Sequence, residues 1–289
     1  MKLPSALIST EWLARNLEAP ALRVYDATVF LHINNPGPGY TPESGREKWR
    51  AAHVPGADFI DLLGEFSDQN SPVRFTMPSP ARFAELAGAI GIGDDTAVVL
   101  YSAGSVMWST RVWWMLRSIG FDNAGILDGG WEKWQREGHP VSAEHRPYPR
   151  ATLTPRPRPG LWADRDDMLK VMNNPAVCTI NALSPEVYRG DKNMYGRPGH
   201  IPGSHNVFYN TMLDPANGTY LSPPELKSRF DAVGAFDRRV VVYCGGGISA
   251  TMDALALTLA GHPDVAVYDG SMMEWVSDPA LPLNLGAAP

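Results

Sequence analysis

Short runs of β-branched and other apolar residues alternate along this chain with longer stretches that favour helices. Residues 97–102 form one apolar run and residues 239–244 form another, and each predicts a buried strand. Residues 111–119 and 250–260, which follow these runs, are typical of helices. Because short apolar strands alternate with helical stretches, we expect parallel sheets covered by helices on both faces.

The order of these features repeats once along the chain. The sequence His-Val-Pro-Gly begins at His53, and the similar sequence His-Ile-Pro-Gly begins at His200. The apolar run then ends 49 residues after His53, at Ser102, and 44 residues after His200, at Cys244. An Asp-Gly pair follows the next apolar run at nearly the same distance in both halves. Landmarks in the same order at near-equal spacing indicate two copies of one α/β unit.

We therefore predict two tandem domains of the same α/β class, each with a small, mostly parallel sheet flanked by helices. A length of 289 residues suits two such domains. The proline-rich segment 144–160 can extend neither a helix nor a sheet ladder, and we interpret it as a linker. It separates a first domain, residues 1–143, from a second domain, residues 161–289. The Pro- and Gly-rich residues 35–45 are expected to form a long loop.

The composition is that of a globular protein, with 44% hydrophobic and 19% charged residues. The formal net charge is −6, so we expect neither nucleic acid nor an anionic membrane surface to be the main partner. No segment approaches the ~18 continuous apolar residues that a membrane helix needs. The first residues lack the apolar core of a signal peptide and predict a helix capped by Ser9 or Thr10.

Two cysteines, Cys178 and Cys244, are too few for a disulfide framework in a chain of this length. We therefore expect the protein in the reducing cytoplasm. No group of His, Cys and carboxylate residues has the spacing of metal ligands, so we expect neither a metal nor another cofactor. Cys178 lies within an apolar run, and we interpret it as a small buried core residue.

Cys244 stands in a different context, because a glycine-rich turn separates it from the next helix. The residues of this turn are Gly245, Gly246, Gly247, Ile248 and Ser249. Successive glycines let backbone N–H groups form an anion-binding nest, and the N-terminus of the following helix adds partial positive charge. Such a cradle stabilises a thiolate or a persulfide. We predict that Cys244 is a nucleophile and that Ser102, at the equivalent position, leaves the first domain non-catalytic.

From residue 5 to residue 285, the chain resembles the tandem-domain rhodanese-type sulfurtransferases. The matching segments are His53–Gly56, His200–Gly203, Cys244–Ser249 and Tyr268–Ser271 with Glu274–Trp275, and in the first half also Arg111–Trp114 and Leu127–Gly130. The resemblance implies double displacement: the Cys244 thiolate takes a sulfane sulfur from a small donor, holds it as a persulfide and passes it to cyanide or a thiol. A thioredoxin-like reductant is a further partner that this chemistry admits.

The active-site loop distinguishes the chemistries of related proteins. Related cysteine phosphatases place an arginine six residues after the nucleophile, where this chain has Ala250, so we do not expect phosphatase activity. Rhodaneses that use thiosulfate typically carry basic residues directly after the cysteine, whereas those that use 3-mercaptopyruvate read Cys-Gly-Ser-Gly-Val-Thr. The uncharged loop here is similar to the second pattern, with Gly246 in place of the serine. We expect 3-mercaptopyruvate as the donor; thiosulfate, or a persulfide carrier with little turnover, are the alternatives.

A 2-oxo-acid donor needs cations for its carboxylate, and Arg189 and Arg197 are the candidates in the second domain. The alternative for either arginine is a solvated loop residue. Many rhodanese domains read Asp-Ala-Arg where this chain has Asn-Ala-Leu at residues 181–183, a departure close to these arginines. The resemblance also implies that His53 faces the active-site loop from the first domain, the alternative being a structural turn histidine.

Overall fold

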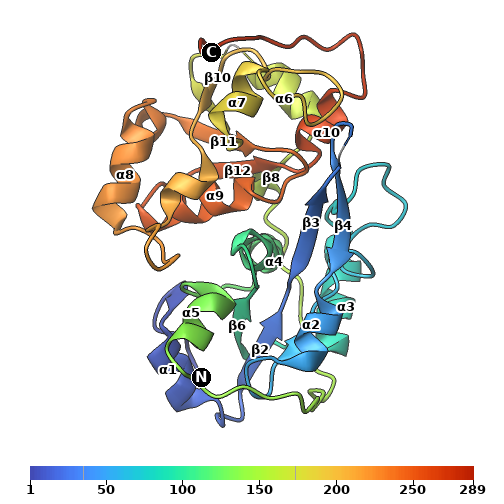
Figure 1. Ribbon diagram of the computed structural model, residues 1–289, viewed down its shortest axis with the longest axis vertical. Coiled ribbons are helices and arrows are strands. Elements are labelled where there is room, and N and C mark those ends of the chain that lie inside the picture. The colour runs from blue at the N-terminus through green and yellow to red at the C-terminus, as the bar shows by residue number, and fades with distance from the viewer. Residues whose placement is uncertain (35, 173) are drawn as a thin grey trace.

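Two five-stranded sheets form the framework of the protein. The computed structural model describes residues 1–34, 36–172 and 174–289, and Figure 1 shows one α/β body above the other. The strands of the first sheet, in spatial order, are β1 (Leu7–Ile8), β7 (Ala124–Leu127), β6 (Ala97–Tyr101), β2 (Leu22–Asp26) and β5 (Asp58–Phe59). Those of the second are β10 (Ser204–Asn206), β9 (Val177–Asn181), β11 (Arg239–Tyr243), β12 (Val265–Tyr268) and β8 (Trp162–Ala163). All neighbouring strands in both sheets are parallel.

Helices connect the strands in each body. Those of the first are α1 (Thr10–Asn16), α2 (Arg46–Ala51), α3 (Pro80–Ala89), α4 (Met107–Ser118) and α5 (Gly130–Arg136). Those of the second are α6 (Arg165–Val171), α7 (Pro185–Arg189), α8 (Pro223–Asp231), α9 (Ala250–Leu259) and α10 (Ser271–Trp275), with short 3-10 helices at Pro159–Leu161, Tyr209–Met212 and Ala235–Asp237. The predicted fold class, two α/β domains with parallel sheets flanked by helices, is confirmed.

The expectation that residues 35–45 form a loop is wrong for residues 40–44. Strand β4 (Tyr40–Ser44) pairs antiparallel with β3 (Val29–Ile33), while Asn35 lies outside the described residues. A proline is compatible with β4 because both strands of a two-stranded sheet are edges, where a nitrogen that faces away from the partner strand makes no ladder bond. Figure 1 shows this hairpin reaching from the first body to the side of α10 in the second.

The predicted linker, residues 144–160, lies against the first body. Within the described chain, residues 144–158 form neither helix nor strand. The Tyr148 hydroxyl in this segment donates to the carbonyl of Gly56 at 2.7 Å. We keep the domain limits of residues 1–143 and 161–289, with this segment between them, as a proposal.

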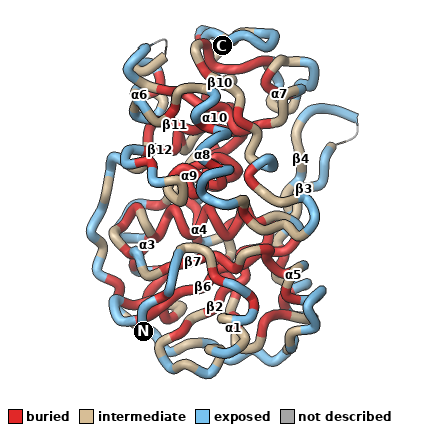
Figure 2. Tube along the Cα trace, turned by 90° about the vertical axis from the view of Figure 1, so that its left-hand side faces the viewer, coloured by how far each residue is buried: buried red, intermediate tan, exposed pale blue. Residues whose placement is uncertain are grey.

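Helices α4 and α9 pack against each other between the two sheets. Figure 2 shows both helices largely buried in the middle of the molecule. Thr110 Oγ1 on α4 lies 2.8 Å from Thr251 Oγ1 on α9. Trp113 and Trp114 on α4 are buried, and one continuous apolar cluster contains residues from both sheets. The two bodies are therefore packed as one unit.

Asp253 on α9 is an unusual member of this buried region. It is fully buried, and neither carboxylate oxygen has a hydrogen-bond partner among the described residues. Burial raises the pKa of this carboxyl well above its ordinary value of 3.8, because the charged form loses its hydration. As the pH rises above that value, the unfolded chain has released the proton while the folded chain retains it. The free energy of unfolding therefore falls by about 1.4 kcal/mol per pH unit from this one group.

We expect Asp253→Asn to remove this pH dependence. As the pH rises above the ordinary pKa of an aspartate, the free energy of unfolding of the variant relative to the parent protein should rise, by about 1.4 kcal/mol per pH unit until the folded-state pKa is reached. Denaturant titrations at a series of pH values measure the difference. Asp166→Asn, at an exposed aspartate on α6, is the control and should show no such slope. A difference that stays constant with pH for Asp253→Asn would contradict the expectation.

Candidate active site

Cys244 directly follows β11, the central strand of the second sheet, at the carboxyl end of that strand. Ligands of open α/β sheets bind at this edge. Cys244 is buried, with 1% of its surface exposed, and the loop 245–249 then leads into α9. The structure therefore brings the predicted nucleophile and the predicted loop together at one place.

The hydroxyl of Ser271, the first residue of α10, holds the loop in shape. It accepts the backbone N–H groups of Cys244 and Gly247, each at 3.1 Å, and donates to the carbonyl of Tyr268 at 2.7 Å. The N–H of Met272 donates to the carbonyl of Cys244 at 3.0 Å. Because α10 satisfies these groups from one side, the loop keeps its curled form around the sulfur.

Other N–H groups of the loop are left free to bind an anion. Among the described residues, the backbone N–H groups of Gly245, Gly246, Ile248, Ser249 and Ala250 have no hydrogen-bond partner. They stand where α9 begins, so the partial positive charge of the helix N-terminus is directed at the same place. This arrangement is suited to a thiolate or to the terminal sulfur of a persulfide.

Arg111 on α4 reaches the loop from the first body. Its guanidinium is fully buried and donates from Nη1 to the carbonyl of Gly247 at 3.1 Å. It donates from Nη2 to the carbonyl of Phe75 at 2.6 Å. Nη1 also lies 2.7 Å from Oδ1 of Asp269, and Oδ2 of that aspartate accepts the N–H of Met77 at 2.8 Å. This ion pair joins the active-site loop to two segments of the first domain.

Apolar and aromatic side chains enclose Cys244 in a cavity of about 50 Å³. The walls outside the loop are Leu31, Tyr40, Met107, Trp108 and Tyr195. All but Tyr195 come from the first domain. Burial, together with the neighbouring Cys244, raises the pKa of Tyr40 to about 12 and that of Tyr195 well above 10. Both phenols are therefore neutral near pH 7 and add no negative charge beside the sulfur.

The two arginines predicted to bind a substrate carboxylate do not line this cavity. Arg197 donates to the carbonyls of Asp278 at 2.9 Å and Leu281 at 2.8 Å. Arg189 forms a salt bridge with Asp191 at 2.7 Å. Each guanidinium thus has partners in its own domain, and binding of a substrate carboxylate by either one stays a prediction.

His53 is likewise absent from the lining of the Cys244 cavity. It is fully buried in the first domain, with Nδ1 2.7 Å from the carbonyl oxygen of Trp49 and Nε2 3.2 Å from that of Glu144. Its ring also stacks on Trp49. His200 has the same arrangement in the second domain, with both ring nitrogens on backbone carbonyls. The two histidines fit the reading of structural turn residues.

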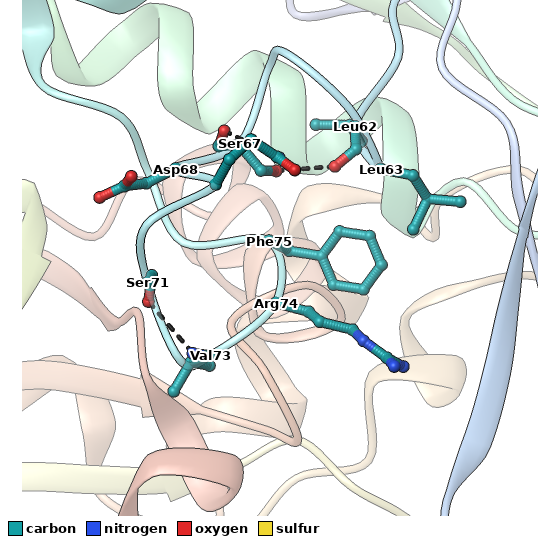
Figure 3. Close-up of a pocket in the computed structure, with 9 residues that line it drawn as sticks. Leu62, Leu63, Ser67, Asp68, Ser71, Val73, Arg74 and Phe75 are labelled. Atoms are coloured by element: carbon teal, nitrogen blue, oxygen red, sulfur yellow. Dashed lines mark hydrogen bonds between the residues drawn. The ribbon is translucent and has the colours of Figure 1, made fainter.

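Most of the side chains that the first domain brings to the site were not predicted from the sequence. Arg111 offered a signal, because a charged residue on a helix beside the core pair Trp113 and Trp114 needs a buried partner. Tyr40 had none, since its strand was expected to be a loop. Arg74 also had none: Figure 3 shows it next to Phe75 on an irregular loop of the first domain, far in sequence from Cys244.

A family model for the rhodanese-like domain matches residues 9–137 and 171–278. The chain is 36% identical over 286 residues to thiosulfate sulfurtransferase of Bos taurus, covering 93% of this chain and 91% of the relative. It is 33% identical over 292 residues to 3-mercaptopyruvate sulfurtransferase of Homo sapiens, covering 95% and 93%. The crystal structure of SseA, a 3-mercaptopyruvate sulfotransferase from Escherichia coli, matches with a TM-score of 0.79 at 27% identity and covers 92% of this chain and 98% of SseA.

With two such matches and relatives aligned over nearly its whole length, the chain belongs to the rhodanese family. It is a sulfurtransferase, an enzyme that acts on small sulfur donors and acceptors. Within the described ranges, no three His, Cys, Asp or Glu side chains are grouped so as to hold a metal ion. Every helix of those ranges is too short or too polar to cross a membrane.

Proposed function

We propose that Cys244 is the catalytic nucleophile and that the first domain, with Ser102 at the equivalent position, carries out no chemistry itself. The proposal rests on the position of the thiol, in a cradle of unpaired N–H groups where α9 begins. The Cys244 thiolate attacks the transferable sulfur of the donor, and the bond between that sulfur and the rest of the donor breaks. Its electron pair leaves with the donor fragment, which is sulfite from thiosulfate or the enolate of pyruvate, which takes up a proton, from 3-mercaptopyruvate, and a persulfide remains. Cyanide or a thiol then attacks the outer sulfur, and the thiolate is restored.

We favour 3-mercaptopyruvate as the donor because the active-site loop, residues 245–249, carries no cation for a thiosulfate dianion. Arg189 and Arg197, which were predicted to bind the carboxylate, do not support this preference. Relatives named for both donors occur at similar identity, so thiosulfate is the second candidate.

Steady-state kinetics with each donor, using cyanide and a dithiol as acceptors, test the preference. We expect kcat/KM for 3-mercaptopyruvate to exceed that for thiosulfate by about tenfold or more, a difference of about 1.4 kcal/mol in transition-state binding. A ratio of one or less would establish thiosulfate as the preferred donor. A persulfide on Cys244 without turnover of either donor would instead establish a persulfide carrier.

The glycine at position 246 is expected to limit activity with 3-mercaptopyruvate. A Cβ there would lie 3.2 Å from Sδ of Met273 and 3.9 Å from the carbonyl of Arg74. Because the Met273 side chain is flexible near its sulfur, Gly246→Ser should fit after a small shift. The added hydroxyl should raise kcat/KM for this donor about fivefold, the value of one hydrogen bond. Gly246→Ala carries the same Cβ without the hydroxyl and should give no increase; an equal gain in both variants would exclude the hydroxyl as the cause.

We also propose the reducing cytoplasm as the compartment and a thioredoxin-like reductant as one acceptor of the persulfide sulfur. Both cysteines, Cys178 and Cys244, are free and buried. A thiolate nucleophile stays reduced where cellular thiol systems are active, and those systems supply the dithiols that can discharge a persulfide.

A further inference from the structure

A second cavity adjoins the small cavity around Cys244. It has a volume of about 300 Å³, and Tyr40 and Tyr195 line both cavities. The two tyrosines therefore stand between the space next to the sulfur and the larger space outside. Tyr40 is fixed on the outer side by a 3.5 Å contact from its hydroxyl to Sδ of Met273.

The two cavities differ in size and therefore in the ligands that they admit. The inner cavity, about 50 Å³, has room for the persulfide sulfur and a few further atoms, since a cavity of about 10–15 Å³ holds one water. The outer cavity, about 300 Å³, is at the lower end of the range for sites that bind organic ligands. Cyanide alone leaves this outer space unused.

The lining of the outer cavity is apolar with one cation. Pro38, Met194, Met273 and Val276 form much of the wall, and Arg74 is its charged residue. Among the described residues, no carboxylate lines it. Arg111, the other arginine beside the loop, is already paired with Asp269, whereas Arg74 is exposed and available to a ligand. The charge and the surface together suit a ligand with an apolar body and an anionic group.

We propose that the outer cavity binds the sulfur acceptor, and that this acceptor is an organic thiol with an apolar or aromatic body and a carboxylate that meets Arg74. The proposal rests on the proposed persulfide at Cys244. Met194 and Met273 contact the apolar body, and their flexible thioethers adapt to an aromatic ring. The thiol passes between Tyr40 and Tyr195 to reach the persulfide.

The transfer step is balanced without an oxidant or reductant. The acceptor thiolate attacks the outer sulfur of the protonated Cys244 persulfide, and a new sulfur–sulfur bond forms in the acceptor. The sulfur–sulfur bond to Cys244 breaks, and its electron pair returns to the Cys244 thiolate. The proton of the persulfide leaves with the product, which is the acceptor persulfide. The oxidation state of the transferred sulfur does not change.

Single-turnover discharge of the persulfide tests the proposal separately from the donor reaction. The enzyme is loaded with a sulfur donor, freed of donor by gel filtration, and mixed with one of four acceptors. These are 2-benzyl-3-mercaptopropanoate, its amide, 3-mercaptopropanoate and cyanide. We expect the second-order rate constant for the benzyl acid to exceed those for the amide and for 3-mercaptopropanoate at least tenfold. Equal rate constants for the three thiols would overturn the proposal.

Arg74→Gln should reduce the ratio of the rate constant for the benzyl acid to that for its amide from tenfold or more to about one. Arg82→Gln, which removes another exposed arginine of the first domain, is the matched control and should leave the ratio unchanged. An unchanged ratio in Arg74→Gln would also overturn the proposal. If no persulfide forms on Cys244 during loading, the proposed function fails instead, so the two failures are distinguishable by mass spectrometry before any acceptor is added.

Discussion

Cys244→Ser is expected to abolish sulfur transfer while leaving the protein folded. A serine hydroxyl has nearly the size of the thiol and fits the same buried position, but it is not ionised near pH 7 and does not carry a sulfane sulfur. We expect kcat to fall by about 10⁴-fold or more, the size of loss seen when a catalytic nucleophile is removed. Cyanide-dependent formation of thiocyanate, with each donor in turn, measures it.

Cys178→Ser is the matched control for this variant. Cys178 is also buried, and its thiol lies 3.7 Å from the carbonyl of Val233 in the second domain, a contact that a serine hydroxyl can replace. Burial raises the pKa of the Cys178 thiol, which keeps it in the unreactive neutral form. This variant should keep most of the activity. Thiocyanate formation by Cys244→Ser, or its loss in Cys178→Ser with an unchanged melting temperature, would refute the assignment of the nucleophile.

Arg111→Met is expected to have the second largest effect. The guanidinium is fully buried and holds the carbonyl of Gly247 in the active-site loop, the carbonyl of Phe75 and the carboxylate of Asp269. Methionine has a similar length but leaves all three without their partner. Breaking a buried pair of this kind costs about 3 kcal/mol of stability. A loop that is no longer fixed should also lower kcat about 100-fold, since small misplacements of reacting groups have effects of this size.

Arg111 is a positioning residue, because it contacts the loop rather than the sulfur. The rate at which iodoacetamide alkylates Cys244 in the folded protein therefore belongs to the test. A loosened loop should change the alkylation rate and should lower kcat more than it raises KM. A loss of stability alone leaves the alkylation rate and kcat of the folded fraction unchanged. Arg117→Met removes a half-buried arginine from the same helix and should have little effect on either. Normal kcat and alkylation in folded Arg111→Met would show that the loop does not depend on the ion pair.

The parts of the site that follow from local sequence were predictable. The strand ending at Cys244, the glycine turn and the start of α9 are consecutive, so their spacing alone places the thiol in an N–H cradle. The duplication was also visible in the sequence, because similar motifs in the same order at near-equal spacing are enough to recognise it. The same reasoning placed Ser102 at the equivalent point of the first domain.

The parts that depend on contacts between domains were not predictable in this way. Arg189 and Arg197 were chosen because they are near the motif of His200 in sequence, and their contacts with carboxylate and carbonyl groups of their own domain could not be foreseen from that position. The cations and aromatic rings that approach the loop come mainly from the first domain. Tyr40 was hidden because a Pro- and Gly-rich segment was expected to be a loop, while an edge hairpin accepts such residues.

The ion pair between Arg111 and Asp269 has a consequence for the history of this duplicated chain. Arg111 stands nine residues after Ser102, and the residue nine positions after Cys244 is Asp253. A homodimer built from two second halves would thus bring an aspartate, not an arginine, toward Asp269, and like charges would meet at a buried contact. The two halves of the chain have therefore diverged, and neither can replace the other at this contact. The active-site loop therefore depends on a residue of the half that does not hold the sulfur.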